Sequence, residues 1–69
     1  MTQCERLVAY MRDNGSITSA EAMSELGIMR LASRIADLKE MGMQIESKMV
    51  KGFNRFGQPT HYTRYSLKQ

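Results

Sequence analysis

The stretch GIMRLASRIADLKEMG, residues 27–42, is the most informative about the fold, because two glycines bracket a helical pattern that follows another helix almost directly. Leu31, Ile35 and Leu38 have the i, i+4, i+7 spacing of one helix face, which predicts a helix over about residues 29–41. Only two or three residues separate it from the preceding helical pattern. Helices joined by so short a turn with a glycine cross steeply, so the stretch predicts the second helix of a helix-turn-helix.

Upstream of this stretch, two capping boxes mark the starts of two further helices. The boxes are Thr2 with Glu5 and Thr18 with Glu21. They predict helices over about residues 3–12 and 19–26. An extended connector lies between them, and Ile17 is the inward anchor of a short strand there.

Downstream of residue 42 the apolar period changes from helical to alternating, which predicts a β-hairpin over about residues 44–67. Two glycines and the only proline place a long loop at residues 52–59. The predicted fold class is α+β, mainly α: a single winged helix-turn-helix domain over residues 1–69, with a three-helix core and a C-terminal hairpin wing.

Composition favours a globular chain in the cytoplasm. The 69 residues are 42% hydrophobic and 25% charged, no apolar run reaches the length of a membrane helix, and the N-terminus lacks the pattern of a signal peptide. Cys4 lies on an apolar stripe and is expected to be a small buried hydrophobe. Met11, Met23, Met41 and Met49 are likewise expected to fill the core, whereas Met29 and Met43 flank the third helix and could be exposed.

Charge is distributed unevenly along the chain. Residues 43–69 carry five Lys and Arg against one Glu, a net charge of +4, whereas residues 1–42 carry five against six acidic residues, a net charge of −1. A basic C-terminal element is typical of a protein that meets a polyanion.

Catalytic chemistry has no recognisable pattern in this sequence. Cys4 and His61 lie at opposite ends, show no metal-ligand spacing, and no phosphate-binding or nucleophile-elbow glycine motif occurs. We therefore expect no enzyme activity, no cofactor, no metal and no small-molecule substrate.

The polar side of the predicted third helix carries side chains that can face bases in a major groove. These are Met29, Arg30, Ser33, Arg34 and Asp37. Arg donates a bidentate pair to guanine, and Ser and Asp can also bind base edges. The alternative is a solvated face with an Arg34–Asp37 surface pair, and from this helix alone the two interpretations are equal.

The predicted hairpin favours nucleic acid, because it carries long donors on both strands and on the loop. These are Lys48, Lys51, Asn54, Arg55, Gln58, His61 and Arg64. Gly52 and Gly57 would let the backbone approach a phosphate closely. For Phe53 and Phe56 we favour a small core beneath the hairpin; the alternatives are an exposed partner-binding spot or a wedge between bases.

The run GIMRLASRIADLKEMGMQIES and the closing HYTRYSL resemble the small winged helix-turn-helix domains common in bacteriophage and prophage genes. The matching positions are Gly27, Ile28, Ala32, Arg34, Ile35, Leu38, Gly42, Ile45, Arg64, Tyr65 and Leu67. The resemblance implies DNA binding in a phage-type transcriptional regulator or an excisionase-like accessory factor. It also allows Arg34 to be a structural residue beside Ile35 instead of a base reader.

The sequence thus predicts a double-stranded DNA-binding protein, with the third helix in the major groove and the wing on the backbone. One module has a small footprint, so strong specificity should require dimerisation or cooperative binding. The alternative function is a winged-helix module for protein interaction, with Met29, Phe53 and Phe56 as contact points. RNA is a weaker alternative, because no aromatic sheet face is evident.

Overall fold

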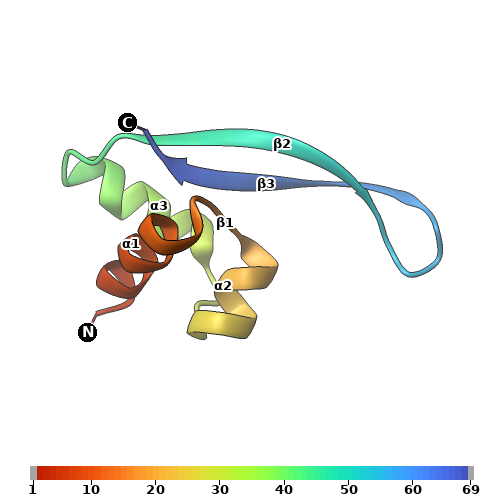
Figure 1. Ribbon diagram of the computed structural model, residues 1–69, viewed down its shortest axis with the longest axis horizontal. Coiled ribbons are helices and arrows are strands. Elements are labelled where there is room, and N and C mark those ends of the chain that lie inside the picture. The colour runs from red at the N-terminus through yellow and green to blue at the C-terminus, as the bar shows by residue number, and fades with distance from the viewer. Residues whose placement is uncertain (1, 69) are drawn as a thin grey trace.

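The computed structural model describes residues 2–68, in which three helices lie along one end of a long β-hairpin (Figure 1). The elements in chain order are α1 (Gln3–Asn14), β1 (Ile17–Thr18), α2 (Ser19–Leu26), α3 (Leu31–Glu40), β2 (Ile45–Phe53) and β3 (Pro59–Leu67). The strands form one antiparallel sheet in the order β1-β3-β2. This arrangement confirms the predicted winged helix-turn-helix fold, including the short strand at Ile17.

Local sequence signals set the starts and ends of the first two helices. Both predicted capping boxes form, with Thr2 capping α1 and Thr18 capping α2. α1 runs two residues further than expected before it ends at Gly15. α2 ends at Gly27, whose φ of 69° lies in the left-handed region that glycine adopts without steric cost. That conformation turns the chain sharply into α3.

The third helix begins later than the sequence predicted. α3 starts at Leu31 because the preceding Arg30, with φ −123° and ψ 67°, is outside the helical region. Met29 and Arg30 therefore belong to the turn between α2 and α3 and not to the helix.

The core gathers apolar side chains from all three helices, β1 and the turn before α3. Its buried members are Leu7, Met11, Ile17, Ala22, Ile28, Leu31, Ile35 and Leu38. The methionine prediction was right for Met11 but wrong for Met23, Met41 and Met49, which are 51%, 65% and 63% exposed. Met43 instead packs against the core, and Cys4 is only half-buried.

The hairpin spans the predicted residues, but its strands are longer and its loop is shorter than predicted. β2 and β3 pair from Ile45↔Leu67 out to Phe53↔Pro59, so only residues 54–58 form the loop. Proline is tolerated there because it is the first residue of its strand. β1 pairs only with Arg64 and Tyr65, and the distal part of the hairpin extends past α2 away from the helices (Figure 1).

Candidate nucleic-acid interface

The start of α3 presents exposed side chains and an uncapped helix end. Met29 is 75% exposed, and Arg30 occupies the N-cap position without making a side-chain capping hydrogen bond. The first turn of α3 contains no acidic residue. Free backbone N–H groups at a helix N-terminus, together with the helix dipole, favour an anion. The guanidinium of Arg30 adds a positive charge at the same place.

Arg34 and Asp37 are half-buried on α3 and pair with each other. The Nη2 atom of Arg34 lies 3.1 Å from Oδ2 of Asp37, and the two side chains are 38% and 47% exposed. Within residues 2–68, the Nε atom of Arg34 is buried and has no hydrogen-bond partner. A partly exposed i, i+3 ion pair contributes only a few tenths of a kcal/mol to stability. Breaking the pair so that either residue can contact a base would therefore cost little free energy. The surface pair considered in the sequence analysis is therefore present.

The sequence prediction missed exposed residues of α3, among them Ala32, Ala36 and Lys39. The predicted Ser33 is instead half-buried. The signal was available, because these residues fall between the members of the buried stripe in the helical period. Ala32 and Ala36 are one helical turn apart, and their small side chains would let the backbone of α3 approach the floor of a DNA groove closely.

Strand register places the basic residues of the hairpin on two opposite faces. Lys51 is the cross-strand partner of His61, on the face that Ile45 and Tyr65 direct toward the core. Lys48 is the partner of Arg64 on the other face. Lys48, Lys51 and His61 are all exposed. The structure therefore brings the predicted wing residues together as two cross-strand pairs, one on each face.

Arg64 differs from the other wing cations, because it has intramolecular partners. Its Nη1 atom donates to Oγ of Ser16 over 3.0 Å and lies 3.4 Å from Oε1 of Glu21. The same carboxylate oxygen accepts the backbone N–H of Thr18 over 2.9 Å. Arg64 thus joins the hairpin to the capping box that starts α2, and its guanidinium is only partly available to a ligand.

Asn54 and Gln58 build the tip of the wing. Oδ1 of Asn54 accepts the backbone N–H groups of Phe56 and Gln58 over 2.9 and 3.0 Å. Nδ2 of Asn54 donates to Oε1 of Gln58 over 3.1 Å. These bonds fix the five-residue loop, in which Gly57 has a φ of 76°. The two amides predicted to contact DNA are therefore used within the loop, and they order the backbone on both sides of the exposed Arg55.

The aromatic residues of the wing do not form the small core that we favoured. Phe53 and Phe56 are 77% and 80% exposed, so that prediction was wrong. Gly52 also differs from expectation: a β-carbon there would lie 3.1 Å from the ring of Tyr62. The ring of Tyr62 on the neighbouring strand covers this glycine, an arrangement that stabilises glycines within β-strands. Close approach of a phosphate at this face of Gly52 is therefore blocked.

In the described part of the chain, residues 2–68, Glu5 and Tyr10 have shifted pKa values, and both lie outside the wing. The pKa of Glu5 is lowered because the backbone N–H and the side chain of Thr2 interact with its carboxylate. The pKa of Tyr10 is raised, first by desolvation and then by the carboxylates of Glu21 and Glu25.

Among residues 2–68, no three His, Cys, Asp or Glu side chains come together as metal ligands. No helix in this part of the chain is long and apolar enough to cross a membrane.

Three helices, a tight turn before the third and a basic two-stranded wing define the winged-helix class of proteins. A family model described as a winged helix-turn-helix domain matches residues 2–69. The chain therefore belongs to the winged helix-turn-helix family. Neither the curated proteins nor the solved structures include a significant match.

Proposed function

We propose that this protein binds double-stranded DNA, with α3 in the major groove and the hairpin on the sugar-phosphate backbone. The observation that carries the proposal is the projecting hairpin, where Lys48, Lys51, Arg55 and His61 are exposed. Between residues 2 and 68, none of these four forms an ion pair. The free cations among them, Lys48, Lys51 and Arg55, suit phosphates, which supply most of the affinity of a DNA-binding protein. Membership in the family supports the same function.

The two elements divide the task between them. Arg30, exposed at the start of α3, is the candidate base reader, because the N-terminal residues of a recognition helix contact base edges. Ala32 and Ala36 let α3 lie close to the floor of the groove. Arg55, at the tip of the wing, and Lys51, on its strand, contact phosphates. Arg34 and Asp37 stay paired with each other on α3. Arg64 joins the hairpin to the start of α2.

The biological role that fits is binding without chemistry. A module of this size acts as a phage-type transcriptional regulator or as an excisionase-like accessory factor that positions DNA for other proteins. Both roles need affinity for DNA and neither needs a catalytic group.

Single alanine substitutions separate base reading from backbone binding. Arg55→Ala should weaken binding to every duplex alike. It should also reduce the slope of log K against log salt by about one unit, as expected for the loss of one phosphate contact. Arg30→Ala should cost about 1–3 kcal/mol on a selected site and little on other sequences. Arg6→Ala, which removes an exposed charge from α1, is the matched control and should change neither. If Arg30→Ala loses the same binding free energy on all duplexes, Arg30 contacts the DNA backbone and not a base.

A protein-interaction module is the second candidate, favoured by three exposed apolar side chains. Met29, Phe53 and Phe56 are all at least 75% exposed. Phe53 and Phe56 lie three residues apart at the tip of the wing, and contiguous exposed apolar patches often mark interaction sites. Salt distinguishes the two functions, because phosphate binding weakens steeply as ionic strength rises and apolar docking does not.

A further inference from the structure

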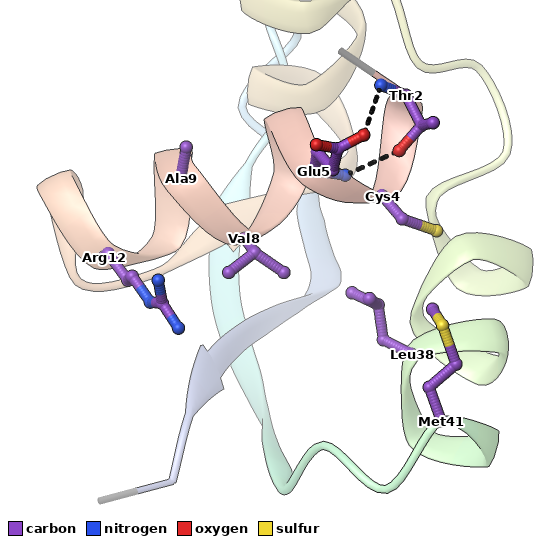
Figure 2. Close-up of a pocket in the computed structure, with 8 residues that line it drawn as sticks. All are labelled: Thr2, Cys4, Glu5, Val8, Ala9, Arg12, Leu38 and Met41. Carbon is purple, nitrogen blue, oxygen red and sulfur yellow. Dashed lines mark hydrogen bonds between the residues drawn. The ribbon is translucent and has the colours of Figure 1, made fainter.

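An apolar groove lies between α1 and the C-terminal half of α3. Figure 2 shows Cys4 and Val8 of α1 beside Leu38 and Met41 of α3. The groove has a volume of about 440 Å³ and shares no residue with the exposed cations of the wing or with the turn before α3. Met41 is 65% exposed there, although it is a large apolar side chain.

Charges are placed symmetrically along the α1 wall of this groove. Glu5 and Arg12 are both exposed residues that line it, and Val8 and Ala9 lie midway between them. If two α1 helices pack antiparallel with the twofold axis at this midpoint, Glu5 of each copy faces Arg12 of the other. Val8 of each copy then meets Ala9 of the other. A surface that complements itself in this way is what an isologous dimer requires.

We propose that this groove is a homodimer interface, in which the α1 helices of two copies pack antiparallel about an axis between Val8 and Ala9. The small side chains of Cys4 and Ala9 allow the helices to approach closely. Met41 of each copy covers the edge of the contact and loses its exposure to water. The opposite charges at the two ends fix the antiparallel orientation, because a parallel pair would place Glu5 against Glu5.

This interface would be modest in size, so we expect a reversible dimer that forms at high protein concentration. Each copy would keep its turn before α3 and its wing free. The proposal does not depend on DNA binding, since the dimer is tested with the protein alone. Failure of one proposal therefore leaves the other standing.

Complementary charge reversals test the arrangement by sedimentation equilibrium of the full chain. Glu5→Arg places positive charges opposite each other in the dimer, and Arg12→Glu places negative charges opposite each other. Each variant alone should raise the dimer Kd roughly tenfold. An equimolar mixture of the two should dimerise about as well as the natural protein, because both cross-axis pairs become attractive again.

Controls separate charge pairing from folding. Glu5 belongs to the capping box of α1, where its carboxylate accepts the backbone N–H of Thr2 over 3.0 Å. Far-UV circular dichroism must therefore confirm that each variant is folded, and Glu5→Gln, which can preserve the box, should weaken the dimer less than the reversal does. Arg6→Glu, a charge reversal on α1 outside the groove, should leave dimerisation unchanged. A natural protein that stays monomeric at millimolar concentration, or a mixture no more dimeric than its folded components, would overturn the proposal.

Discussion

Arg64 and Lys51 show how two basic residues of one hairpin acquire different tasks. Both lie on the strands of the wing, yet Arg64 reaches back to Ser16 and Glu21 whereas Lys51 is exposed opposite His61. The difference arises from register, because Arg64 pairs with Thr18 of β1 and therefore lies next to the start of α2. Arg64 is a structural residue first, and Lys51 is available to a ligand.

Neutral substitutions at these two positions should separate stability from binding. Arg64→Gln should lower the free energy of unfolding by about 0.5–1 kcal/mol, since it removes a partly exposed ion pair and shortens a packed side chain. Lys51→Gln should leave stability unchanged and weaken DNA binding. Urea denaturation and fluorescence anisotropy with a duplex measure the two effects. A larger loss of stability for Lys51→Gln than for Arg64→Gln would contradict this division.

The sequence could predict which residues were candidates but not which of them already had partners. Arg64, Asn54 and Gln58 are long polar residues in a basic hairpin, and nothing in their spacing distinguishes them from Lys48 or Arg55. Their partners depend on strand pairing and on the exact loop closure, which a composition argument does not determine. The Arg34–Asp37 pair could be anticipated, because i, i+3 neighbours on a helix are within reach of each other.

At the scale of elements, helices were easier to predict than the hairpin. Capping boxes and left-handed glycines are local signals, so the starts of α1 and α2 and the end at Gly27 followed from a few residues each. Gly52 and Pro59 suggested a loop, yet both lie in strands. Gly52 is supported by the ring of Tyr62 across the sheet, and Pro59 begins β3. Such cross-strand support cannot be seen in the sequence of one strand.

The wing tip should depend on Asn54 for its order. Asn54→Ala removes the acceptor for two backbone N–H groups and the donor to Gln58. We expect faster amide hydrogen exchange at Phe56 and Gln58, with little change in the helices. DNA binding should weaken although no charge is lost, because the loop backbone that carries Arg55 would no longer be ordered. Unchanged exchange at both amides would show that the loop does not rely on this side chain.

At the scale of the whole molecule, one small core supports every functional element. The buried side chains come from the three helices, from β1 and from the turn before α3, and Ile45, Tyr65 and Leu67 attach the hairpin to them. Beyond this attachment the wing has few neighbours, so its exposed cations are free to meet a ligand (Figure 1). Burial fixes the base of the hairpin, whereas its distal half remains exposed and available to a ligand.

Truncation of a central core residue should therefore come close to unfolding the protein. Leu7 is fully buried, and Leu7→Ala should cost about 2–5 kcal/mol. The total stability expected for a chain of this length is roughly 3–10 kcal/mol. Thermal unfolding followed by circular dichroism should show a large drop in Tm or the absence of a cooperative transition. The exposed Met23→Ala is the control, and a Tm for Leu7→Ala equal to that of this control would contradict the proposed core.

DNA binding by this protein can be tested by an NMR titration of the isotope-labelled chain with a generic DNA duplex at low and at moderate salt. We predict chemical-shift changes concentrated in residues 29–39 and 48–61, which decrease as salt rises because phosphate contacts are screened and counterions compete. Substitution of Arg55 by alanine should reduce them throughout the wing. Absence of shifts on both surfaces at low salt would contradict the DNA-binding account, and the search would turn to a protein partner for Phe53 and Phe56.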